Sequence, residues 1–177
     1  MIENLKKCSW LLVGLCLVMF LFGCDSSGGS DDSDDLTTDP YPSISVEPYL
    51  PTSEFTAPIA ARYKTTVDLE KETISGTKYV TKDIETIYLF DDNTWVKTET
   101  KVYVNTSTGT VTRTDKKPEE KGAYVFNSGD VTNGSITLTV SHDWDDDTSS
   151  WEADTGTVTI TPSSGKFKIG TDSYSSF

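Results

Sequence analysis

The chain has few of the residues that build disulfides, thiolate centres and histidine-based sites. Its three cysteines, Cys8, Cys16 and Cys24, all lie near the N-terminus, and His142 is the only histidine. No thiol follows Cys24, so the rest of the chain contains neither a disulfide nor a cysteine nucleophile. A single histidine also removes the main ligand of a histidine-based metal centre.

The sequence also lacks an apolar run long enough to span a bilayer. Lys6 and Lys7 precede an apolar run over residues 9–22, which is shorter than the roughly 20 residues that a membrane-spanning helix needs. A positive start and a short apolar run are typical of a signal peptide. The run ends with Leu21-Phe22-Gly23-Cys24, which resembles the lipobox of bacterial lipoproteins. The resemblance implies that residues 1–23 are a lipoprotein signal peptide and that Cys24 carries a lipid anchor.

Basic residues are absent from the stretch between positions 25 and 61, where aspartate and glutamate are frequent. Serine, glycine, threonine and proline supply most of the remainder, a composition that buries too little apolar surface to fold. We interpret residues 24–61 as the lipidated cysteine followed by an acidic, Pro-rich flexible tether. Five apolar residues leave open that part of this segment packs on the following domain: Tyr41, Ile44, Val46, Tyr49 and Leu50.

The net charge of the chain is −13 at pH 7. A nucleic acid or an anionic lipid surface is recognised by clustered lysine and arginine, which this balance does not provide. The sequence therefore argues against a polyanionic partner and against nucleic acid in particular.

Residues 62–177 alternate apolar and polar side chains with a period of two. In residues 134–141, for example, Ile136, Leu138 and Val140 alternate with serine and threonine. Period two with many β-branched and aromatic residues predicts β-strands, and no stretch shows helical spacing. Turn-forming clusters divide this part into predicted strands near 62–70, 78–90, 94–104, 109–114, 121–127, 134–141, 156–161 and 165–170, with a possible last strand near 173–176.

Short connections between successive strands favour an antiparallel meander. We therefore predict an all-β domain over residues 62–177, an antiparallel up-and-down barrel of eight or nine strands, with a β-sandwich as the alternative. Trp95 and Tyr124 are expected in its core, although Val96, Val102 and Val104 lie at the opposite parity to Trp95.

Four short motifs in this domain are Phe90-Asp91-Asp92-Asn93-Thr94-Trp95, Lys121-Gly122-Ala123-Tyr124, the run from Gly134 to Thr139, and Gly165-Lys166-Phe167-Lys168-Ile169. These motifs are similar to those of small bacterial lipoproteins with lipocalin-like (calycin) barrels. The resemblance implies a lipocalin-like barrel, and many members of this group have no known activity.

Three groups of polar residues carry the spacing of a reactive site, and each has a simpler interpretation. Asp143, Asp145, Asp147 and Asp154 match positions of a calcium loop, but Thr148 replaces its glycine, which makes them a weak calcium candidate. Ser141-His142-Asp143 are consecutive, so we do not expect a catalytic triad. The pairs Asp91-Asp92 and Glu119-Glu120 are interpreted as solvated turns. We expect no enzyme activity and no cofactor.

The aromatic and aliphatic residues give two binding hypotheses. A hollow barrel would line a cavity for a small hydrophobic ligand with these side chains: Tyr63, Val67, Tyr88, Phe90, Phe126, Ile136 and Leu138. A filled barrel would leave recognition to its surface, where Trp144 and Trp151 are the first candidates. We expect the filled barrel, and hence a lipid-anchored, extracytoplasmic, non-enzymatic binding or interaction module of the bacterial cell envelope with an unknown protein partner. The alternative is a carrier of a small hydrophobic ligand.

We predict that Cys24→Ser leaves an unprocessed or soluble form of the chain, because the substitution removes the residue expected to carry the lipid anchor and stable attachment needs more than one acyl chain. Membrane fractionation of the wild type and the variant measures this. A correctly cleaved Cys24→Ser chain that still sediments with membranes would contradict the anchor assignment.

Overall fold

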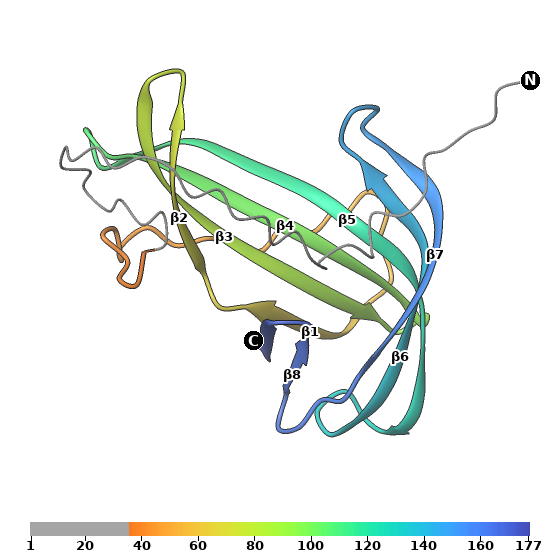
Figure 1. Cartoon of the computed structure of the whole chain (residues 1–177). Helices are drawn as coiled ribbons and strands as arrows, with labels where there is room; N and C mark the ends of the chain where they lie inside the picture. The colour runs from red at the N-terminus through yellow and green to blue at the C-terminus, as the bar shows by residue number, and fades with distance from the viewer. Residues whose placement is uncertain (1–35) are drawn as a thin grey trace, which may run out of the picture. The chain divides into compact units, whose positions relative to one another are not determined.

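The computed structural model describes residues 36–177, and Cys24 with the rest of residues 1–35 lies outside the described part. Nine antiparallel strands form a single curled sheet (Figure 1). Their bounds are β1 Ile59–Thr65, β2 Asp68–Ile74, β3 Thr77–Phe90, β4 Thr94–Asn105, β5 Thr110–Gly129, β6 Gly134–Asp145, β7 Ser150–Ile160, β8 Lys166–Ile169 and β9 Asp172–Ser176.

Strands β3 to β7 pair in chain order, and the full order is β7-β6-β5-β4-β3-β1-β9-β8, with β2 also on β3. The sheet curls into a half barrel, with β7 and β8 at its two ends (Figure 1). The prediction of an all-β, antiparallel up-and-down architecture is confirmed. Because all nine strands belong to one sheet, the arrangement differs from the two-sheet sandwich of the alternative.

The first predicted strand, residues 62–70, is two strands in the structure. β1 pairs with residues 86–90 of β3 and β2 pairs with residues 77–83, so both lie along the same edge of β3. The tight turn between β2 and β3 uses Ser75 and Gly76, both at positive φ, which matches the twist of a two-residue hairpin. β1 is thereby free to pair on its other side with β9.

The strands predicted near 109–114 and 121–127 are one continuous strand, β5. Pro118 lies within it, opposite Thr98, where the register between β4 and β5 shifts in a β-bulge. A proline disrupts a ladder least at a bulge, so the strand continues past it. The prediction of a solvated turn at Glu119-Glu120 is therefore wrong.

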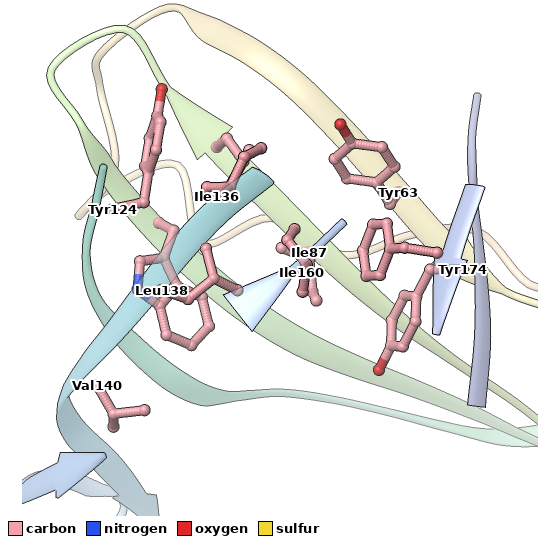
Figure 2. Close-up of a cluster of buried hydrophobic side chains, with 11 residues drawn as sticks. Tyr63, Ile87, Tyr124, Ile136, Leu138, Val140, Ile160 and Tyr174 are labelled. Atoms are coloured by element: carbon pink, nitrogen blue, oxygen red, sulfur yellow. The ribbon is translucent and has the colours of Figure 1, made fainter. Parts of the chain in front are cut away.

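One face of the sheet, here called the inner face, carries the main apolar core. Eleven buried residues from eight strands form it, among them Leu89, Trp95, Leu138 and Ile160, none more than 8% exposed (Figure 2). The ring of Phe167 meets Tyr63 edge-on at 4.8 Å and stacks on Tyr174 at 5.1 Å. The expected burial of Trp95 and Tyr124 is confirmed.

The opposite, outer face of β3 and β4 is covered by residues 36–58, here called the arm. Val46 of the arm is buried with Ile84, Val102 and Val104, and Phe55 stacks on Phe90 with ring centroids 5.3 Å apart. Figure 1 shows the arm in orange, passing along the sheet. The described part of the expected tether is therefore packed on the domain, which explains why both parities of β4 are apolar.

A buried lysine fixes the arm. Lys82 of β3 is 3% exposed, and its Nζ lies 2.6 Å from Asp39 Oδ2. The same ammonium donates to the carbonyl oxygens of Tyr41, at 3.1 Å, and Ile44. All three partners belong to the arm, so the arm both covers the ammonium of Lys82 and satisfies its charge.

We predict that Asp39→Asn lowers the free energy of unfolding by about 3 kcal/mol, because it leaves the buried ammonium of Lys82 with neutral acceptors and no counter-charge. The double variant Asp39→Asn with Lys82→Met should recover most of this loss. Chemical denaturation measures both. Arg113→Ala, which breaks the exposed pair with Asp115, is the matched control and should leave the free energy of unfolding close to the wild-type value. If Asp39→Asn has an effect as small as that of the control, the Lys82–Asp39 ion pair does not stabilise the fold as proposed.

Candidate functional site

The residues expected to line a cavity do not surround one space. Tyr63, Ile136 and Leu138 are packed in the inner core, whereas Tyr88 and Phe90 lie on the outer face beneath the arm. Val67 and Phe126 are 39% and 44% exposed. These residues therefore do not form the common lining that the hollow-barrel alternative would require, because Val67 falls in the break between β1 and β2 and because β3 is buried on both faces.

Beyond the apolar core, the inner face carries a half-buried network of carboxylates and lysines. Lys97 Nζ lies 3.1 Å from Glu85 Oε1 and 3.2 Å from Glu119 Oε2. Lys117 Nζ lies 3.1 Å from both Glu99 Oε2 and Asp146 Oδ2. This part of the inner face, on β3, β4 and β5, is therefore polar. A lipocalin-like carrier would have apolar side chains there.

Burial perturbs the carboxyl groups of this network. Desolvation, reinforced by the neighbouring Glu99, raises the pKa of Asp83 to about 7. Desolvation also raises the pKa of Glu119 to about 7 against the opposing effect of Lys97. Glu119 and Glu120 are thus half-buried strand residues, which corrects the interpretation of this pair as a solvated turn. The other pair, Asp91-Asp92, does lie in the β3–β4 turn, where hydrogen bonds from Thr94 lower the pKa of Asp92.

An open trough of about 450 Å³ adjoins this network at the start of β2 and β9. Val67 lines the trough, but most of its walls are polar. The hydroxyl and carboxylate groups come from Thr65, Asp83, Glu85 and Asp172 among others. The hydroxyl of Tyr174 donates to Glu85 at the border between the trough and the apolar core. An apolar ligand placed here would strip water from carboxylates without replacing their hydrogen bonds, which is unfavourable.

The four aspartates of the calcium candidate do not converge on one point. Asp143 faces Asp154 and Glu120, and desolvation with the Asp154 charge raises its pKa to about 6. Asp145 instead accepts hydrogen bonds from the backbone of Asp147 and Thr148, closing the hairpin turn. Among residues 36–177 no group of three or more aspartate, glutamate, histidine or cysteine side chains is arranged to hold a metal ion.

Ser141 and His142 do come together, with Oγ and Nδ1 3.0 Å apart, because a bulge between Val140 and His142 turns this part of β6. Asp143 points the other way, toward Asp154. The three residues therefore do not form a Ser–His–Asp hydrogen-bond chain, which that arrangement requires.

Trp144 and Trp151 form a cross-strand pair on the hairpin of β6 and β7. Their rings meet edge-on with centroids 5.2 Å apart, and both side chains are half-buried. Trp151 Nε1 donates to Glu54 Oε2 at 2.9 Å, and Lys121 Nζ lies 4.2 Å from the centre of the Trp151 ring while also pairing with Glu54. The arm thus fixes the orientation of the candidate surface.

A second open pocket, of about 400 Å³, lies where the arm meets this end of the sheet. It is lined by the following residues of the arm, β3, the β3–β4 turn, β4, β5 and β6: Glu54, Phe55, Thr56, Ala57, Phe90, Asp92, Thr94, Lys121, Gly122, Ser141 and His142. Glu54, Phe55 and Lys121 are not among the residues expected from the sequence, because no sequence pattern places a tether segment against β5.

No family model matches the chain, and no curated protein or solved structure is significantly similar to it. Within residues 36–177, no helix is long and apolar enough to cross a membrane.

We predict that the inner-face network makes stability fall as pH rises. The folded chain binds protons on Asp83 and Glu119 more tightly than the unfolded chain does, so their stabilising contribution is present below about pH 4 and is lost through about pH 7. The free energy of unfolding should therefore drop by about 1 kcal/mol or more between about pH 5 and about pH 8.

Glu119→Gln should flatten this pH dependence, and chemical denaturation at the two pH values measures it. Asp147→Asn, at the exposed turn of the β6–β7 hairpin, is the matched control and should keep the wild-type slope. If the wild-type chain has the same free energy of unfolding at both pH values, the raised pKa values of Asp83 and Glu119 are refuted.

Proposed function

We propose that the chain is a lipid-anchored, extracytoplasmic binding module of the bacterial cell envelope, without enzymatic activity, that meets its partner with its outer surface. The lipobox resemblance at Cys24 supports the anchor and the compartment. The close packing of the inner apolar side chains supports binding through the outer surface, and this packing is the observation on which the proposal rests.

A carrier of a hydrophobic molecule needs a mostly apolar cavity that encloses its ligand. The inner apolar side chains here pack instead against one another, and Leu89, Ile136 and Ile160 are fully inaccessible to solvent. The trough on the same face is open and lined with carboxylates. These features favour the binding module over the carrier.

The outer surface offers the recognition features that the inner face lacks. Half-buried tryptophans with a hydrogen-bonded indole are typical of contact sites, because they combine a large apolar face with a polar handle. Trp144 and Trp151 are held in place by the arm and by β5, so this surface is formed before a partner arrives. A preorganised surface loses less entropy on binding.

A filled interior predicts a large cost for truncating an inner side chain. Leu138→Ala should lower the free energy of unfolding by about 3 kcal/mol, since the buried leucine leaves a void. Val125→Ala, on β5 and 58% exposed, is the control and should change it by about 0.5 kcal/mol or less. Chemical denaturation measures both.

Native mass spectrometry of the full chain extracted from membranes completes this test. We expect a covalent lipid at Cys24 and no second, non-covalent lipid at one per chain. A non-covalent lipid at that ratio, together with an unchanged unfolding free energy in Leu138→Ala, would overturn the binding module in favour of the carrier.

A further inference from the structure

We propose that the pocket between the arm and the β4–β6 end of the sheet binds a neutral saccharide, stacking a sugar ring on an aromatic side chain. This inference rests on the proposed binding function and gives it a ligand class. The pocket of about 400 Å³ falls in the size range of small-molecule sites and is large enough for a sugar unit or two.

The pocket presents an aromatic surface that is already rigid. The Phe55 ring is nearly parallel to the buried ring of Phe90, at an interplanar angle of 8°. Phe55 is half-buried and lines the pocket, together with Ala57 of the arm. An apolar ring face bordered by polar groups suits a pyranose, whose C–H groups form an apolar face and whose hydroxyls point outward.

Short polar side chains surround this aromatic surface. Four of them reach the pocket from the β3–β4 turn, from β4 and from β6: Asp92, Thr94, Ser141 and His142. Asp92 Oδ1 already accepts from Thr94, but a carboxylate accepts through two oxygens and keeps further capacity. Ser141 Oγ lies 3.0 Å from His142 Nδ1, so hydroxyl and imidazole act as one polar unit. Such groups accept and donate hydrogen bonds, as sugar hydroxyls require.

The charges of the pocket argue for a neutral ligand. Its cation, Lys121, is paired with Glu54 and covers the Trp151 ring, so it is not available to an anionic ligand. The remaining acid, Asp92, would repel a polyanion. A ligand that offers both donors and acceptors without a net charge fits this balance.

The strands at the pocket also exclude one common mode of peptide binding. β4 pairs with β3 and β5, the Lys121 part of β5 pairs with β4 and β6, and β6 pairs with β5 and β7. No strand edge is therefore open at the pocket for an extended peptide to join the sheet. A ligand that does not add a strand to the sheet, such as a saccharide, suits this arrangement.

Binding of maltotriose and of N,N′,N″-triacetylchitotriose to the full chain tests the proposal by isothermal titration calorimetry. The indole N–H signal of Trp151 in two-dimensional NMR provides a second readout, because Trp151 contacts Glu54 and Lys121 of the pocket wall. Mannitol, which has hydroxyls but no ring face, is the control ligand. We expect saturable binding of at least one trisaccharide with a shift of the Trp151 signal, and no such response to mannitol.

Asp92→Asn and His142→Gln should each raise the Kd for the trisaccharide by about tenfold. This is the expected effect of losing one hydrogen bond to a charged or polar partner. Asp172→Asn, in the inner-face trough, is the matched control and should bind as the wild type does. Absence of saturable binding to both trisaccharides, an equal response to mannitol, or binding that both pocket variants retain in full would overturn the saccharide site. None of these results bears on the anchor or on the filled interior, so the proposed function fails or stands by its own test.

Discussion

The structure depends on the burial of β3 and β4 on both faces. These two strands carry apolar side chains at both parities, with Leu89 and Trp95 inward and Tyr88 and Val96 outward. A sheet only one layer thick cannot bury both sets, so the arm has to cover the outer side. Because the chain after Cys24 has no disulfide, this packing and the ion pair between Lys82 and Asp39 hold the domain together.

The inner face divides into two regions with different chemistry. Near β6, β8 and β9 it is an apolar core built on aromatic rings, and toward the start of β3 it becomes a network of ion pairs around Lys97 and Lys117. An apolar ligand could occupy neither region, because the first is filled and the second would leave carboxylates without water. Within residues 36–177, neither of these two regions of the inner face forms the enclosed apolar cavity that a carrier needs.

The arm links this architecture to the proposed function. It completes the outer core, supplies Glu54 to the indole of Trp151, and forms one wall of the outer pocket through Phe55. Contacts that stabilise the fold therefore also shape the surface available for recognition. Variants in the arm should consequently be judged by both stability and binding.

The sequence by itself determined the all-β class and most strand positions, since period-two alternation is a local property of the chain. It also indicated that Trp95 and Tyr124 are buried. Only the tertiary structure decided that Glu119 and Glu120 belong to a continuous strand, because the bulge that accommodates Pro118 forms between β4 and β5. It alone placed the arm on the sheet, since an acidic, Pro-rich composition resembles a solvated spacer until Lys82 and the apolar outer face of β3 and β4 are present to receive it. Composition reports the average behaviour of a segment, whereas packing depends on a few side chains whose partners are distant in the sequence.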